Sequence, residues 1–223
     1  MSKLIFWHFI FLFYIYYNMC WNAEVSLNTF IYALISFVIV ISFNRISLFA
    51  PIIALSVSLM QLYEYFIWKN IHNKKIIDNI SIIGPFIILL QLLLLNYAFL
   101  KGKERIIAIV LIFILFIISL IIRSYDYNNL KITIGENGHL LWHWADLPPI
   151  LLIFIFILYL YPLSKKNNKT AFIFIAIALL ISLYYYYNYK TWGTMWCYFS
   201  NLIWIYLIIA SIYLYMNNEY DTD

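Results

Sequence analysis

Seven long apolar runs constrain the fold of this chain more than any other feature of its sequence. Each has few or no charged residues and is close to the roughly 20 residues that a helix needs to cross the hydrocarbon core of a bilayer. An eighth candidate, Leu4–Cys20, lies at the N-terminus. The seven runs are Ser26–Phe43, Ile46–Trp68, Asn79–Leu100, Ile106–Ile122, Leu147–Leu163, Ala171–Asn188 and Met195–Tyr215.

The composition indicates that lipid is the solvent for most of the chain. The sequence is 65% hydrophobic and only 11% charged, whereas soluble domains are about 25% charged. In lipid, backbone groups must find partners within the protein, so spans are helices or closed barrels. The runs do not alternate polar and apolar residues as barrel strands do. We therefore expect an all-α integral membrane bundle of seven core spans, with an eighth N-terminal span as an open alternative.

The chemically unusual residues gather in the connections on one side of the predicted bundle. Six of the eight tryptophans, three of the four histidines and both cysteines fall in these stretches. An interfacial aromatic belt explains tryptophans at this depth, and stacking on a bound ligand is the alternative. The stretches are 20–24, with Cys20 and Glu24, the end of the third span up to His72, the loop 123–148, and 191–197.

Glu64 is the most costly residue in the predicted spans. It lies about one turn inside the end of its span, where a carboxylate needs a partner, a proton or water. Gln61, Glu64 and Trp68 follow the spacing i, i+3 and i+7, so they share one helix face. That face is expected to point into the bundle. It serves either a ligand site or a hydrogen bond between helices.

His139, His143 and Asp146 are spaced i, i+4 and i+7, which would place them on one side of a helix. Two histidines at this spacing can share a zinc ion. Zinc would then activate a water molecule for hydrolysis, with a third ligand such as Glu24, Glu64, His72 or a cysteine. The alternative is a pair of interfacial histidines bonded to backbone or headgroups. The glycines before the pair and Pro148 after it favour turns.

Cys20 and Cys197 are expected at one depth on the same face. A disulfide between them is possible if that face is exoplasmic and the two Cα atoms lie within about 7 Å. If the face is cytoplasmic, the thiols stay free.

Three short motifs resemble a family of uncharacterised multi-pass membrane proteins. Residues 19–26, Met-Cys-Trp-Asn-Ala-Glu-Val-Ser, look like the Met-Cys-Phe-Ser-x-x-x-Ser opening of its bacterial members, with Asn22 in place of serine. Gln61 to Trp68 and Trp196-Cys197 resemble two further motifs in the same order. The resemblance implies a hydrophobic extension at 1–18, a polytopic domain at 19–215 and a short acidic tail at 216–223. It implies no activity, and relatives are expected in large DNA viruses and protists.

Two classes of function remain open for the sequence. The first is a binding, transport or structural module. Its site candidates lie on the Trp-rich face, the side of the predicted bundle formed by the stretches 20–24, the end of the third span up to His72, 123–148 and 191–197. The second is a membrane-embedded, metal-dependent lipid hydrolase with His139, His143 and Asp146 at the metal. No phosphate-binding loop and no arginine-rich voltage sensor occurs. Membrane lipid is the expected partner, and nothing in the sequence indicates nucleic acid. The site candidates are Cys20, Glu24, Gln61, Glu64, Trp68, Trp196 and Cys197.

Overall fold

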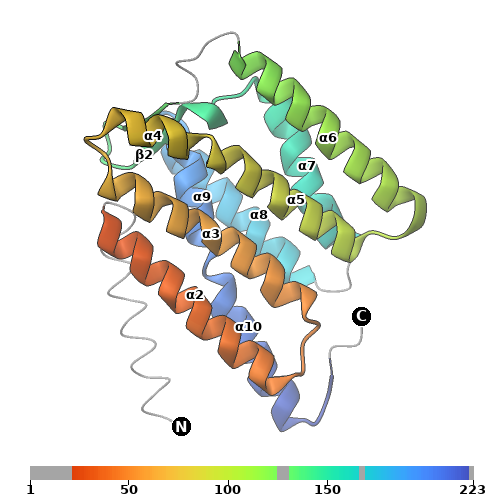
Figure 1. Ribbon diagram of the computed structural model, residues 1–223. Helices are drawn as coiled ribbons and strands as arrows, with labels where there is room; N and C mark the ends of the chain where they lie inside the picture. Colours follow the sequence, from red (N-terminus) through yellow and green to blue (C-terminus); the bar gives the residue numbers. More distant parts are fainter. Residues whose placement is uncertain (1–21, 125–130, 166–168, 221–223) are drawn as a thin grey trace.

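A computed structural model describes residues 22–124, 131–165 and 169–220, so the expected span at Leu4–Cys20 lies outside the described residues. The described part is a helical bundle capped at one end by a small β-hairpin (Figure 1). Its helices are α2 (Ala23–Phe43), α3 (Phe49–Lys69), α4 (Lys74–Ser81), α5 (Ile83–Phe99), α6 (Gly102–Ser124), α7 (Pro149–Lys165), α8 (Lys169–Tyr186), α9 (Trp192–Ser200) and α10 (Ile203–Met216).

All seven apolar runs fall on helices. Within the described residues, five helical segments are long and apolar enough to cross a membrane: Ala23–Phe43, Phe49–Lys69, Lys74–Phe99, Gly102–Arg123 and Trp192–Met216. The third of these joins α4 to α5, and the fifth joins α9 to α10. The helices of the other two runs, Pro149–Lys165 and Thr170–Tyr186, are apolar but shorter. Length and composition therefore support five of the seven predicted spans.

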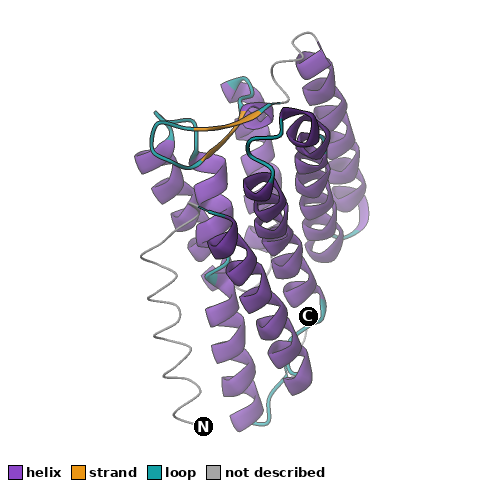
Figure 2. Ribbon diagram, turned by 60° about the vertical axis from the view of Figure 1, so that its left-hand side comes forward, coloured by secondary structure: helices purple, strands orange, loops and turns teal. Residues whose placement is uncertain are grey.

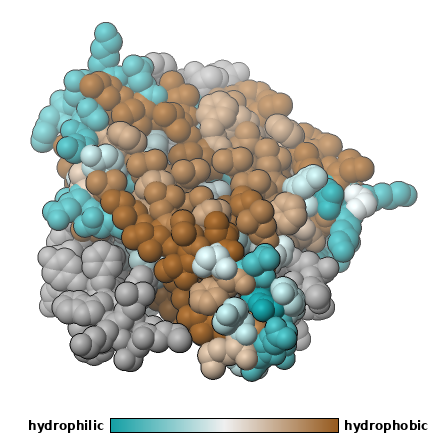
Figure 3. Space-filling model, turned by 60° about the horizontal axis from the view of Figure 1, so that its bottom comes forward, coloured by the Kyte–Doolittle hydropathy of each residue, from teal (hydrophilic) through white to brown (hydrophobic). Residues whose placement is uncertain are grey.

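The distribution of polar and apolar side chains is the reverse of that in a water-soluble bundle. Ile106 and Leu180 are each 64% exposed, whereas Gln61 and Asn96 are fully buried. Figure 3 shows apolar residues over the centre of one face of the molecule, with hydrophilic residues towards its edges. Such a surface would be unstable in water, and it fits a helical bundle solvated by lipid.

Local sequence signals explain where several helices begin and end. Asn22 caps α2, since its side-chain oxygen accepts a 3.0 Å hydrogen bond from the backbone N–H of Val25. Asn44 ends the same helix in the left-handed conformation, at φ 48°. Asn73 caps α4 in the same way as Asn22 caps α2. Pro85 lies in the first turn of α5, where its missing N–H has no partner to lose.

Helix α3 lies at the centre of the bundle. It packs against α2, α5 and α9, and it also contacts α10, which packs on α2. On the other side, α5 contacts α6 and α7, and α8 packs between α7 and α9. Figure 1 shows α6 at the outer edge of this arrangement.

The loop before α7 forms a β-hairpin, not a helix. Strands β1 (Ile132–Ile134) and β2 (Leu140–Trp142) pair antiparallel, and the 3-10 turn η2 (His143–Ala145) follows. Gly138 has φ +79° in the connecting turn, a conformation that glycine adopts without strain. Figure 2 shows the two strands lying across the ends of the helices. The expectation that a helix places His139, His143 and Asp146 on one side is therefore wrong.

A buried polar network joins α3 to the junction between α9 and α10. The Ser58 hydroxyl donates to the side-chain oxygen of Asn201. Trp204 Nε1 donates to Ser58 Oγ at 2.9 Å, and Asn201 Nδ2 donates to the carbonyl of Cys197 at 2.8 Å. Asn201 thus satisfies backbone and side-chain groups where the last long span is interrupted.

We expect Asn201→Leu to lower stability by about 0.6–1.7 kcal/mol, the range measured for hydrogen bonds between membrane helices. The reason is that the Ser58 hydroxyl and the Cys197 carbonyl each lose a buried partner. Thermal unfolding in detergent measures the change. Asn70→Leu is the matched control, because the Asn70 side chain makes a local, exposed hydrogen bond to the Phe66 carbonyl in the last turns of α3. Equal losses in both variants would contradict a stabilising role for the buried network.

Candidate functional site

Three segments that are distant in sequence meet beneath the hairpin: the end of α3, the stretch 137–147, and the start of α9. The Thr194 hydroxyl donates to the Leu140 carbonyl at 2.9 Å. Trp144 Nε1 donates to the Tyr63 hydroxyl at 3.2 Å. Asn137 Nδ2 donates to Thr191 Oγ1 at 2.8 Å. These bonds fix the hairpin on both α3 and α9.

Two glycines allow the hairpin tryptophans to lie flat against the helices. The rings of Trp142 and Trp144 stack with their centroids 5.0 Å apart and their planes 10° apart. A Cβ at Gly84 of α5 would lie 2.5 Å from Cζ2 of Trp144. A Cβ at Gly193 of α9 would lie 3.1 Å from Cε3 of Trp142. The stacked pair therefore depends on the absence of a side chain at both positions.

Glu64 is fully buried and lies next to α9, as its predicted inward face requires. Gln61 and the Thr194 hydroxyl are the neighbouring polar groups of its carboxyl. Neither carboxyl oxygen has a partner within hydrogen-bond geometry among the described residues. A carboxyl in this position needs a proton or a cationic partner, because an isolated buried charge costs several kcal/mol.

A cavity of about 80 Å³ lies between α5, α6, α7, α9 and the hairpin. Its walls are mostly apolar, and four of the six tryptophans of the predicted Trp-rich face line it. Arg123, from the last turn of α6, also lines it. The four tryptophans are Trp142, Trp144, Trp192 and Trp196.

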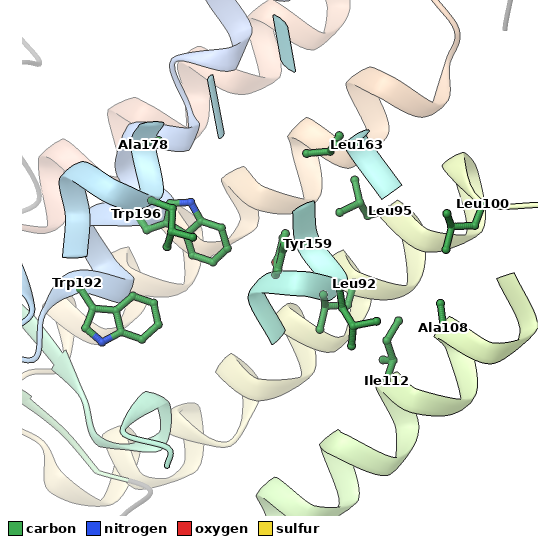
Figure 4. Packing of buried hydrophobic residues seen from close by; sticks show 12 residues of the cluster. Leu92, Leu95, Leu100, Ala108, Ile112, Tyr159, Leu163, Ala178, Trp192 and Trp196 are labelled. Carbon is green, nitrogen blue, oxygen red and sulfur yellow. The ribbon is translucent and has the colours of Figure 1, made fainter. Parts of the chain in front are cut away.

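A second cavity, of about 100 Å³, lies on the other side of a thin partition. Tyr159, Trp196 and Cys197 line both cavities and form that partition. The rings of Tyr159 and Trp196 pack edge to face with centroids 4.8 Å apart (Figure 4). The Tyr159 hydroxyl donates to the side-chain oxygen of Gln91. The Nε2 atom of Gln91 in turn donates to the Ser56 carbonyl at 3.1 Å. The partition is therefore held by both ring packing and hydrogen bonds.

The other residues expected on the Trp-rich face are not all part of this site. Gln61 is buried with Glu64, and Trp68 is half-buried one turn further along α3. Glu24 is exposed in the first turn of α2, and His72 is exposed in the turn before α4. Cys20 lies outside the described residues, so the disulfide with Cys197 stays a prediction. Cys197 itself is buried in the cavity partition.

The three expected metal ligands have separate surroundings. His139 is buried with its ring 5.6 Å from that of Tyr186, and His143 lies 3.0 Å from the Thr133 hydroxyl. Asp146 accepts a 2.7 Å bond from Lys190. Across the described ranges, no three histidine, cysteine, aspartate or glutamate side chains are grouped as metal ligands. The arrangement of these side chains gives the zinc hydrolase alternative no support.

Electrostatics around the hairpin follow from the same contacts. Partial burial lowers the pKa of His143, and the positive charges of Lys190 and Lys131 lower it further, although Asp146 acts in the opposite direction. The hydrogen bond to Asp146 raises the pKa of Lys190. The Lys190–Asp146 pair is exposed, so it adds little to stability.

Several residues of the site were not singled out by sequence reasoning. Tyr63 and Tyr159 are two of 21 tyrosines, and no sequence signal separates them from the rest. Thr194 lies in the predicted stretch 191–197, but its bond to the hairpin backbone depends on tertiary structure. Arg123 could have been found, because it follows a purely apolar run and is placed at the inner edge of a loop.

No family model, no curated protein and no solved structure matches this chain. The resemblance to the family of uncharacterised multi-pass membrane proteins therefore stays a prediction that rests on the three short motifs.

We expect Gly84→Ala to destabilise the protein by about 1–3 kcal/mol, the usual cost of an overpacked core. The added methyl group would overlap the Trp144 ring and displace the hairpin. In a Trp144→Ala background the same substitution should cost less, since the overlapping ring is gone and only the overlap with the Tyr63 hydroxyl, 2.7 Å from the added carbon, remains. Thermal unfolding of the four proteins of this double-mutant cycle measures the coupling. Additive effects would contradict the close contact between Gly84 and Trp144.

We expect Glu64→Gln to unfold within a few degrees of the wild type and Glu64→Ala to lose about 2 kcal/mol or more. Glutamine fills the same volume and offers a neutral group to Thr194 and Gln61, whereas alanine leaves a cavity. Glu136→Gln, at an exposed hairpin position, is the matched control. If Glu64→Gln loses as much as Glu64→Ala, the carboxyl itself is needed and shape alone does not explain its burial.

Proposed function

We propose that this protein is a membrane-embedded binding module that takes an apolar or amphiphilic ligand from the bilayer into the cavity beneath the hairpin. The observation that carries the proposal is the cavity itself, whose walls include Trp142, Trp144, Trp192 and Trp196. Ligand sites are mostly apolar and aromatic, with few polar groups.

The energetic cost of the cavity favours binding over a purely structural role. Protein interiors are close-packed, and an empty cavity costs about 24 cal/mol per Å³. A cavity of about 80 Å³ thus costs roughly 2 kcal/mol when empty. The second cavity, of about 100 Å³, adds a similar amount. A bundle optimised only for packing would fill this space with side chains, whereas a binding protein keeps it for a ligand.

The burial of the tryptophans also supports a binding role. Tryptophans of an aromatic belt lie at the lipid interface with their rings accessible to headgroups. Trp142, Trp144 and Trp196 are only 3–6% exposed, and Trp192 is 9% exposed. These four rings therefore belong not to a surface belt but to the packed interior around the cavity, where they are placed to contact a bound molecule.

Access from the bilayer is consistent with the position of α6. This helix packs on α5 and α7 and turns most of its apolar surface outwards, with Ile107 and Ile117 more than half exposed. One wall of the cavity therefore belongs to the helix at the edge of the bundle. The cavity is only partly enclosed, so a ligand could enter it from the lipid beside α6, with no water-filled path needed.

Photolabelling with a long-chain alcohol that carries a diazirine tests the proposal on detergent-purified protein. We expect labelling of peptides from α9 and from the hairpin, reduced several-fold by excess unlabelled alcohol. Leu115→Trp should block it, because Leu115 lines the cavity from α6. Leu111→Trp is the matched control, one turn away at an outward position that is 44% exposed. Labelling confined to the outer surface of α6, without competition, would overturn the proposal.

A further inference from the structure

We infer that the ligand of this cavity carries an anionic phosphate or carboxylate headgroup, which Arg123 holds, with the indole N–H groups of Trp142 and Trp196 as further donors in the cavity wall. The inference rests on the proposed function and adds the chemical class of the ligand.

Arg123 is the first reason. Its side chain is only 5% exposed, although it lies near the end of α6. One terminal nitrogen lies 3.4 Å from Ser119 Oγ, and the guanidinium carbon lies 5.9 Å from the centre of the Trp144 ring. Nε has no acceptor, and in the part of the chain that the structure describes no carboxylate pairs with this arginine. Burying an arginine without a counter-charge costs desolvation free energy, and an anionic ligand would offset that cost.

The second reason is the set of unpaired polar atoms around the cavity. Trp142 and Trp196 both line it, and the Nε1 atom of each is buried without an acceptor among the described residues. Indole N–H and guanidinium N–H groups can only donate hydrogen bonds. A ligand that supplies only acceptor oxygens therefore matches these residues.

The hydroxyl groups of the cavity walls are already used. Ser119 donates to the Phe116 carbonyl at 2.7 Å, and Tyr159 donates to Gln91. Glu64 does not line the cavity, so no carboxylate of the described walls would repel an anion. Arg123 would repel a cationic headgroup, and a headgroup with only donors would give the indole N–H groups no acceptor.

The position of Arg123 also fits an amphiphile better than a free anion. It lies at the hairpin end of α6, and the rest of the cavity wall is built from apolar residues of α5, α6 and α7. The cavity, of about 80 Å³, takes only one end of a long-chain amphiphile. A headgroup at Arg123 would place the first carbons of the chain near Leu92, Ile112 and Leu158, with the rest of the chain in the lipid. We therefore commit to an amphiphile with an anionic headgroup.

Competition against the photoreactive alcohol tests this inference in the full-length protein. The competitors are a long-chain alkyl phosphate, the alcohol of equal chain length, and inorganic phosphate alone. We expect the alkyl phosphate to compete roughly tenfold or more better than the alcohol, since hydrogen bonds to charged groups are the stronger ones. Arg123→Gln should remove this advantage without changing competition by the alcohol. Arg105→Gln is the matched control, because Arg105 lies on the same helix far from the cavity, bonded to the Leu100 carbonyl.

The outcomes separate the two proposals. Equal competition by phosphate and alcohol, unchanged in Arg123→Gln, overturns the anionic headgroup and leaves the binding module intact. No competed labelling by any compound overturns both. Competition by inorganic phosphate alone, as strong as by the alkyl phosphate, overturns the amphiphile. If Arg123→Gln fails to fold, Arg123→Met serves instead, since it keeps an apolar stem of similar length and loses the charge; an unchanged preference for phosphate in that variant would overturn the inference. Trp142→Phe and Trp196→Phe each keep an aromatic ring and lose the N–H donor, so a preference for phosphate that is undiminished in both would overturn the role of the indole groups.

Discussion

The absence of water around the middle of the chain is the constraint on which the rest of this structure depends. Lipid cannot pair with polar groups, so each polar side chain in a span must find a partner inside the bundle or remain unpaired at a cost. Asn96 shows how a donor is satisfied, since its Nδ2 atom donates both to its own helix at Leu92 and across to Leu158 of α7, while its Oδ1 atom has no partner among the described residues. Gln91 and Asn201 do the same between other helices. Against this background, buried groups that lack partners stand out as candidates for function.

The hairpin is one of the parts of the molecule where this constraint is not fully met. Its two strands pair with each other. Hydrogen bonds attach it to the helices at Tyr63, Thr191 and Thr194. The indole N–H of Trp142, which points to no described acceptor, is left over. The hairpin therefore combines a firm attachment with an unpaired donor at the cavity, the indole N–H of Trp142. That combination is expected of a wall that contacts a ligand and is not expected of a purely structural cap.

The sequence alone predicted the helices well because apolar length is a local property of the chain. The face of Gln61 and Glu64 was also predictable, since helical spacing places both residues on one side. The hairpin was not, because its strands have three residues each and depend on contacts with Tyr63, Gly84 and Gly193. The His-x-x-x-His spacing pointed to a helix that tertiary contacts replaced with a strand and a 3-10 turn. The cavity could not be predicted either, since it depends on how α5, α6, α7 and α9 pack.

Helix α9 lies near two buried ionisable side chains of the bundle, Glu64 and Arg123. Its Thr194 lies beside the Glu64 carboxyl on one side, while its Trp196 lines the cavity that also holds Arg123. Cys197, on the same helix, contributes to the partition between the two cavities. A ligand that shifts this short helix together with the Trp196 ring would therefore also shift Thr194, the polar neighbour of Glu64. A carboxyl without a counter-charge is sensitive to such a change, because small shifts in its neighbours alter how well its charged form is stabilised. Occupation of the cavity and the state of Glu64 are thus expected to be coupled through one short helix.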